Sequence, residues 1–203
     1  MDNTNKIRKR YDRIAGYFDL LEKPMGTSGF DKWRKELVNQ AKGKTLEVGV
    51  GTGKNLRYYS TEMDLTAIDF SKKMLDKAKA KYKDDLPRTS FLEMDVENMD
   101  FKDESFDTIL TSCVFCSVPN PVKGLEEIKR VLKPNGQLIM LEHVRSGNKM
   151  LGTLMDWFNF IPLYIIGDNI NRRTDENLKK AGFENIKETR LWSDIVKFFI
   201  VKK

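Results

Sequence analysis

An α/β fold with a mainly parallel sheet is the fold class that this sequence predicts. Helical and strand patterns alternate along most of the 203 residues, as in chains whose parallel strands are joined by helices. The segment SFDTILTSCVF at 105–115 is apolar on both faces, which is typical of a central parallel strand. A glycine-rich turn follows the first strand pattern, as in α/β folds that bind ligands at the carboxyl ends of strands.

Two helices are expected before the first strand. In residues 5–21, apolar side chains recur at helical spacing and form one stripe of Ile7, Tyr11, Ile14, Phe18 and Leu21. Residues 29–41 are interpreted as a second helix. The chain is therefore expected to begin with a helical extension in front of the alternating core.

Strands and helices then alternate. TLEVGV at 45–50 is a short buried strand, and the glycines after it lead into a helix expected to begin at 55–59. DLTAIDF at 64–70 is the second strand. Ser71 is expected to cap the next helix, which runs to about residue 82.

The second half of the chain continues this alternation and then departs from it. The expected elements are a strand over 89–96, the central strand over 105–115, a helix over 121–132 with Pro121 at its start, a turn over 134–136, a strand over 137–144, a long apolar and aromatic segment over 147–170, a helix over 172–181 ended by Gly182, and an antiparallel strand pair over 184–203.

Positive charge is concentrated at the two ends of the chain. Residues 1–44 carry 11 basic and 6 acidic side chains, residues 45–144 carry 14 and 17, and residues 145–203 carry 11 and 7. A nucleic-acid-binding surface is usually more densely basic, with interleaved aromatics, so no nucleic-acid partner is expected. The basic ends suit either a solvated surface or peripheral contact with an anionic membrane.

Cysteine content and hydropathy predict a cytoplasmic protein. Two cysteines in 203 residues suit a reducing compartment, and no apolar run reaches the length of a membrane span. The cysteines form one C-x-x-C, Cys113 and Cys116, without the second pair that a zinc site needs, so no metal is expected. Cys113 is interpreted as a core residue. The sequence leaves the oligomeric state open.

The segment EVGVGTGKN at 47–55 is the most informative motif. Its glycines, Gly49, Gly51 and Gly53, allow a sharp turn and let a ligand lie against the backbone at a helix start. A dinucleotide fingerprint would need a third glycine where this chain has Lys54. Glu47, just before the turn, disfavours a pyrophosphate but tolerates a ligand with an ammonium group, such as S-adenosylmethionine.

Two acidic residues follow the next two strands. Asp69 ends the second strand, where a carboxylate can bind a ribose diol. Asp95 ends the third strand and can accept a hydrogen bond from an adenine amino group, with Val96 beside the ring. Either residue alone could be a cap or a turn residue. Their positions at consecutive strand ends favour a nucleoside site.

With these motifs the sequence resembles the class I S-adenosylmethionine-dependent methyltransferases. EVGVGTGKN, AIDFSKKMLDKAKAK (67–81), MDVENMDFKDESFDTIL (94–110) and IKRVLKPNGQLIMLEH (128–143) match the motifs of that family. Residues 11–25 resemble quinone methyltransferases and phosphatidylethanolamine N-methyltransferases, and residues 116–121 and 142–146 resemble alkyl-thiol S-methyltransferases. The resemblance implies a Rossmann-like seven-stranded sheet in the order 3-2-1-4-5-7-6, with strand 7 antiparallel and helices on both faces.

The resemblance also implies one methyltransferase domain over 1–203. Its parts would be a helical cap (1–43), a cofactor-binding core (44–145), an aromatic substrate-side insertion (146–171) and a carboxy-terminal helix and strand pair (172–203). The residues expected to bind S-adenosylmethionine are Tyr17, Glu47, Gly49, Gly51, Thr52, Gly53, Asp69, Phe70, Met74, Asp95, Val96 and Ser112. Those expected near the substrate are Tyr11, Cys116, Arg145, Trp157 and Phe160.

His143 is the candidate catalytic residue. It is the one histidine of the chain and ends the fifth strand, and its ordinary pKa of about 6.5 suits a general base. The alternative is a histidine tied to a backbone group.

The expected function is methyl transfer to a small, rather apolar molecule, with a thiol or amine favoured as acceptor. A lipid amine of the phosphatidylethanolamine type or a quinone ring carbon is the alternative. A non-catalytic cofactor-binding module is a more distant one. A nicotinamide-dependent oxidoreductase fits Lys54 and Asp95 poorly, and CSVPN stands where base-methylating enzymes carry an N/D-P-P-Y-like motif.

Overall fold

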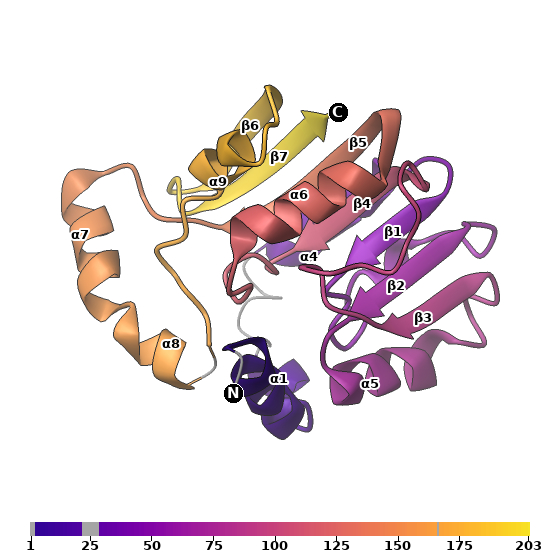
Figure 1. Cartoon of the computed structure of the whole chain (residues 1–203). Helices are drawn as coiled ribbons and strands as arrows, with labels where there is room; N and C mark the ends of the chain where they lie inside the picture. The colour runs from indigo at the N-terminus through magenta and orange to yellow at the C-terminus, as the bar shows by residue number, and fades with distance from the viewer. Residues whose placement is uncertain (1–2, 22–28, 166) are drawn as a thin grey trace.

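A seven-stranded sheet with helices on both faces forms the body of the molecule (Figure 1). The structure is a computed structural model, and it describes residues 3–21, 29–165 and 167–203. The strand order is β3-β2-β1-β4-β5-β7-β6. β7 is antiparallel to both of its neighbours, and the remaining pairs are parallel. The α/β class, strand order and antiparallel seventh strand expected from the sequence are confirmed.

The strands follow the expected segments closely. They are β1 (Thr45–Val48), β2 (Leu65–Asp69), β3 (Thr89–Glu93), β4 (Phe106–Ser112), β5 (Leu132–His143), β6 (Asn185–Trp192) and β7 (Val196–Lys202). β5 begins five residues earlier than expected, so Pro134–Gly136 lies within it instead of forming a separate turn. Asn135 has φ of 65°, and the β4–β5 register shifts between Phe106 and Thr108, which places the irregularity inside the strand pair.

The helices are α1 (Asn3–Ile14), α2 (Phe18–Leu21), α4 (Asp31–Asn39), α5 (Lys72–Tyr82), α6 (Pro121–Val131), α7 (Lys149–Phe158), α8 (Phe160–Ile165) and α9 (Thr174–Lys180). Ser71 caps α5 by accepting a hydrogen bond from the Met74 amide, as expected.

Two expected helices differ in the structure. The single helix expected over 5–21 is interrupted after Ile14, where the Tyr17 amide donates to the Ile14 carbonyl in a tight turn around Gly16. The helix expected from 55 is a single 3-10 turn, Leu56–Tyr58. Asn55 holds that turn, because its side chain donates to Glu47 and accepts from Arg34.

Alternation along the central strands fills two cores, one on each face of the sheet. Ile109 and Met140 pack with α6 and α9, whereas the adjacent Leu110 and Leu141 pack with α4 and α5. Burial on both faces explains why these strands are nearly continuous apolar runs. The two cores hold the parallel strands rigid, and their carboxyl ends then share one edge of the sheet.

The helices α7 and α8 extend away from the sheet (Figure 1). They correspond to the apolar segment expected over 147–170. Within the described part of the chain, no helix combines the length and the apolar character needed to cross a bilayer.

Candidate active site

A cavity of about 580 Å³ lies at the carboxyl ends of β1, β2, β4 and β5. The residues that line it come mainly from these strand ends, from the segment after β3, from α1, α2, α4 and α5, from the segment after α8, and from the adjoining ends of β6 and β7. Twelve of the residues singled out in the sequence line it: Tyr11, Gly49, Gly51, Thr52, Asp69, Phe70, Met74, Asp95, Val96, Ser112, Cys116 and His143. The topology therefore gathers side chains from across 132 positions of sequence into one site.

The glycine turn after β1 forms one wall of the cavity. Gly49 and Gly51 have φ of 67° and 56°, in the left-handed region that favours glycine. A Cβ at Gly49 would lie 2.5 Å from Val114 Cγ2, whereas a Cβ at Gly51 would meet nothing within 4 Å. Gly49 thus lets the turn pack against the end of β4, and Gly51 leaves open space for a ligand.

Asp69 joins the glycine turn to the end of β2. Its two carboxylate oxygens accept hydrogen bonds of 2.8 Å from the amides of Gly51 and Ser71. Burial raises the pKa of Asp69 to about 6, although these two hydrogen bonds favour the ionised form. At neutral pH, Asp69 presents a carboxylate that fixes the turn and faces the cavity.

Asp95 and Val96 lie beyond the end of β3, since that strand stops at Glu93. Asp95 Oδ1 accepts a hydrogen bond of 2.9 Å from the Glu97 amide, and Val96 is buried against Gly124 at the start of α6. Both residues line the cavity. This end of the site pairs a carboxylate with an apolar wall, an arrangement suited to an adenine ring.

Glu47 lies behind the cavity and does not line it. Its side chain accepts a hydrogen bond of 3.0 Å from Asn55, which in turn accepts one of 3.2 Å from Arg34. Burial raises the pKa of Glu47 to about 7. Through Asn55, this buried acid supports the turn from the rear.

Glu142 shapes the other side of the cavity, at the ends of β4 and β5. It is fully buried and accepts hydrogen bonds from Thr111 Oγ1 at 2.8 Å and from the amides of Val114 and Phe115 at 3.3 and 3.2 Å. Burial raises its pKa to about 7. Glu142 was not among the residues expected at the site, although its side chain fixes the chain that carries Cys113 and Cys116.

Two polar atoms point to a polar ligand in this region. Ser112 Oγ and His143 Nδ1 are buried, and neither has a hydrogen-bond partner among the described residues. Both residues line the cavity. Burial lowers the pKa of His143 below 6.5, so its imidazole is neutral at pH 7. A neutral histidine here can accept a proton.

Tyr11 and Asp168 close the cavity opposite the sheet. The Tyr11 hydroxyl donates a hydrogen bond of 2.6 Å to Asp168 Oδ1. Burial, together with Asp168, raises the pKa of Tyr11 well above 10, and burial also raises that of Cys116. Tyr11 therefore stays a phenol that donates to the carboxylate, and Cys116 stays a thiol.

Several cavity residues were missed from the sequence, notably Asp168, Ile170 and Trp192. Asp168 and Ile170 lie at the end of the apolar segment expected over 147–170, and a carboxylate at that boundary is the one signal available. Trp192 ends β6, and nothing in its own segment links it to the glycine turn. Contacts across more than 100 residues of sequence bring these side chains to the site.

Other expected site residues lie outside the cavity. Tyr17, Trp157 and Phe160 are exposed, at 68%, 75% and 65% of their surface. Arg145 is ion-paired with Asp156 at 2.8 Å. Gly53 packs behind the turn, where a Cβ would lie 2.9 Å from the Tyr82 ring. Their expected roles toward a cofactor or substrate stay predictions.

The sequence matches a family model described as a methyltransferase domain over residues 46–140. A thiol S-methyltransferase of Homo sapiens is 31% identical over 86% of this chain and 77% of that protein. A phosphatidylethanolamine N-methyltransferase of Cereibacter sphaeroides is 38% identical over 52% of this chain and 53% of that protein. A demethylmenaquinone methyltransferase of Thermotoga maritima is 34% identical over 68% of this chain and 62% of that protein. The matched part thus spans less than two thirds of the length of the last two relatives.

Solved structures agree with the fold. A SAM-dependent methyltransferase of Thermotoga maritima superposes with a TM-score of 0.68 at 20% identity, over 94% of this chain and 98% of that one. At this identity the likeness describes the arrangement of strands and helices and carries no argument about the acceptor.

Proposed function

This chain belongs to the class I S-adenosylmethionine-dependent methyltransferases, and we propose that it methylates a small, rather apolar acceptor, with a thiol or an amine favoured. The observation that carries the proposal is the shared cavity. Asp69 and Asp95 stand at its nucleoside-binding side, and neutral His143 stands at the end of β5 within the same space. A methyl donor and an acceptor held there would be neighbours.

The residues around the glycine turn fit S-adenosylmethionine. Asp69 suits the ribose hydroxyls, Asp95 and Val96 suit the adenine, and the buried Ser112 hydroxyl suits a polar group near the amino-acid end. When bound, the cofactor supplies an activated methyl carbon and its leaving group. The protein's own residues orient the acceptor and exclude water.

The acceptor side of the cavity is mostly apolar. Ile14, Phe18, Val118 and Ile170 line it together with the Tyr11–Asp168 pair. A compact apolar molecule with one polar atom suits this lining. The human relative named as a thiol S-methyltransferase supports the thiol, and the Cereibacter relative named for phosphatidylethanolamine supports the amine.

A thiol or ammonium acceptor loses one proton for each methyl group that it gains. Two groups in the cavity can take this proton, the neutral imidazole of His143 and the carboxylate of Asp168. We favour His143, because its buried Nδ1 has no partner among the described residues and its lowered pKa keeps the imidazole in the free-base form that can accept a proton.

Three alternatives remain distinguishable. A lipid amine, or a quinone ring carbon as in the Thermotoga relative, would use the same cavity with a longer apolar tail. A non-catalytic module would bind the cofactor without turnover. Methyl transfer from labelled S-adenosylmethionine to thiols, amines, phosphatidylethanolamine or quinols separates all three.

Calorimetric titration of the purified chain with S-adenosylhomocysteine, NAD and NADP tests the cofactor site. We expect micromolar binding of S-adenosylhomocysteine alone, because Glu47 and Lys54 stand where a dinucleotide site needs other groups. Binding of a nicotinamide cofactor instead would contradict the proposal. Cofactor binding without turnover on any of the four acceptor classes would support the non-catalytic module.

His143→Ala is expected to slow methyl transfer to a thiol or amine by about 100-fold, the usual contribution of a general base. Affinity for S-adenosylhomocysteine should stay unchanged. Because the free imidazole is the active form and burial lowers the pKa of His143, wild-type kcat should fall at acid pH, with its midpoint below the ordinary histidine value.

Asp168→Asn is the matched test of the other proton acceptor. We expect it to raise KM, because a neutral amide oxygen accepts the Tyr11 hydrogen bond more weakly than a carboxylate does, while the pH profile of kcat stays in place. Full activity of His143→Ala, or loss of the pH profile in Asp168→Asn, would transfer the role of base away from His143.

A further inference from the structure

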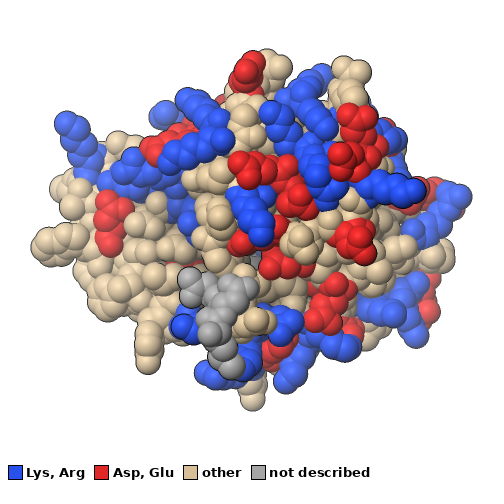
Figure 2. Space-filling view, viewed as in Figure 1, with Lys and Arg blue, Asp and Glu red and all other residues tan. Residues whose placement is uncertain are grey.

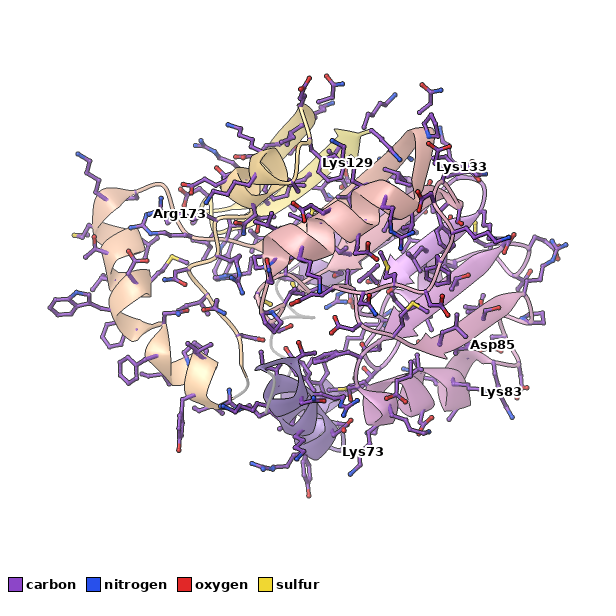
Figure 3. All side chains as sticks on the ribbon, in the orientation of Figure 1. Lys73, Lys83, Asp85, Lys129, Lys133 and Arg173 are labelled. Atoms are coloured by element: carbon purple, nitrogen blue, oxygen red, sulfur yellow. The ribbon has the colours of Figure 1, made fainter. Side chains whose placement is uncertain are left out.

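An exposed apolar surface runs along α7 and α8. Six of their large apolar or aromatic side chains are more than half exposed, and we call these six the apolar arm: Met150, Trp157, Phe158, Phe160, Tyr164 and Ile165. In Figure 2, residues that are neither basic nor acidic dominate the lower left of the molecule, and α7 and α8 lie on the left in the same view in Figure 1. Figure 3 shows side chains of α7 and α8 pointing away from the sheet.

Most apolar side chains of α7 and α8 do not pack into the core. Within α7, Gly152 and Met155 are buried, and α8 has no buried residue. Monomeric soluble proteins rarely expose continuous apolar patches of this kind unless the patch meets a partner or a membrane. The arm is therefore a candidate surface for a partner or a membrane.

A basic helix face adjoins the arm. Helix α1 contains five basic residues and one acidic residue, Asp12, which accepts a hydrogen bond from Ser71. Lys6, Lys9 and Arg13 are exposed at intervals of three and four residues, so they share the outward face of the helix. Arg10 links α1 to the arm by donating a 2.7 Å hydrogen bond to the Leu163 carbonyl in α8.

We propose that the apolar arm and the basic face of α1 dock together on an anionic lipid surface. Aromatic and aliphatic side chains of the arm would enter the interfacial region, and Lys6, Lys9 and Arg13 would meet the lipid headgroups. The positive charge of α1 favours an anionic lipid surface over a second copy of this chain as the partner. A symmetric dimer through the arm would bring two basic α1 faces toward each other.

Docking in this way would place the cavity beside the lipid. Tyr11 and Ile14 of α1 line the cavity, and so do Asp168 and Ile170 just after α8. An apolar acceptor dissolved in the lipid could then reach the site without crossing bulk water. This consequence rests on the proposed function, whereas the docking itself is independent of methyl transfer.

Vesicle sedimentation tests the docking directly. Wild-type protein should sediment with vesicles that contain phosphatidylglycerol at low salt, bind pure phosphatidylcholine vesicles at least tenfold more weakly, and dissociate from the former at high salt. Failure to bind anionic vesicles, or equal binding to both compositions, overturns the proposal. No acceptor or cofactor is needed, so the result does not depend on the proposed reaction.

Two variants, each with a matched control, test whether the arm and the basic face of α1 contact the lipid. Phe160→Ser/Tyr164→Ser should lower vesicle affinity at least tenfold, whereas Phe160→Leu/Tyr164→Leu should retain most of it because the apolar area is kept. Lys6→Gln/Lys9→Gln/Arg13→Gln should lower affinity about 100-fold at low salt. Lys79→Gln/Lys83→Gln/Lys187→Gln removes three exposed charges elsewhere and should have a much smaller effect.

Tryptophan fluorescence gives a second measurement of docking, and thermal unfolding shows whether each variant is folded. Trp157 is 75% exposed in the arm, so lipids with brominated chains should quench its fluorescence, and Trp157→Phe should remove most of that quenching. Thermal unfolding of each variant checks that it is folded. If sedimentation velocity instead shows a wild-type dimer that Phe160→Ser/Tyr164→Ser dissociates, the arm is a protein interface and the proposal is wrong.

Discussion

Asp69→Ala is expected to weaken S-adenosylhomocysteine binding by more than tenfold. The variant removes the carboxylate that would accept the ribose hydroxyls, and it also releases the Gly51 amide that positions the glycine turn. A hydrogen bond to a charged group contributes about 1.5–3 kcal/mol, and about 1.4 kcal/mol corresponds to a factor of ten. Calorimetric titration of wild type and variant measures the loss.

The exposed Asp76 provides the matched control. It lies on α5 and is ion-paired with Lys72 at 2.7 Å, away from the cavity lining. Asp76→Ala should leave cofactor affinity unchanged. Equal affinities of wild type and Asp69→Ala would contradict the assignment of the ribose site.

The raised pKa of Asp69 predicts a specific pH dependence of cofactor affinity. Since burial raises this pKa to about 6, the ligand-free protein binds a proton there as pH falls below 6. The protonated acid is a poorer acceptor for ribose hydroxyls, so affinity should be constant above pH 6 and fall below it by about tenfold per pH unit. Asp69→Asn should show a flat profile over the same range.

Gly49→Ala is expected to destabilise the fold by roughly 2–5 kcal/mol. The left-handed conformation costs a residue with a Cβ about 1–2 kcal/mol, and overpacking costs about 1–3 kcal/mol more. Overpacking applies because the added Cβ would lie 2.5 Å from Val114 Cγ2. Urea unfolding of the ligand-free protein measures the change.

Gly51→Ala separates the cost of the left-handed backbone conformation from the cost of overpacking by the added Cβ. Its φ is also left-handed, but its Cβ would meet nothing within 4 Å, so only about 1–2 kcal/mol should be lost. The added methyl would face the cavity and should weaken cofactor binding instead. In Gly49→Ala/Val114→Ala, removal of the clashing methyl groups should recover part of the stability. Equal losses in the two single variants would contradict the packing argument.

The sheet could be predicted from the sequence because its signals are local. The glycine turn after a buried strand, the acid at the end of β2, and the two-sided apolarity of β4 each lie within a short segment. Their order along the chain, together with the family resemblance, leads to the strand order. For the same reason, the cofactor side of the cavity could be anticipated residue by residue.

The acceptor side could not be anticipated in this way. Asp168 meets Tyr11 across 157 positions, and Glu142 reaches back to Thr111 across 31. The direction of the aromatic segment could not be anticipated either. Trp157 and Phe160 were expected near the substrate because the stretch after the fifth strand tends to close the pocket in this fold. The turn into α7 directs that helix away from the sheet, so both side chains are exposed, and their role toward the substrate stays a prediction.

The helices in front of the cavity are tied to the rest of the chain by short hydrogen bonds. Asp12 accepts from Ser71 at 2.7 Å, Asp19 accepts from Thr52 at 2.6 Å, and Tyr11 donates to Asp168. A bound molecule that leaves past α1 can do so only after these hydrogen bonds break and α1 moves away. The dwell time of a spent cofactor is then governed by how often this front opens, and a slow release step after fast chemistry would appear as a burst of product in the first turnover.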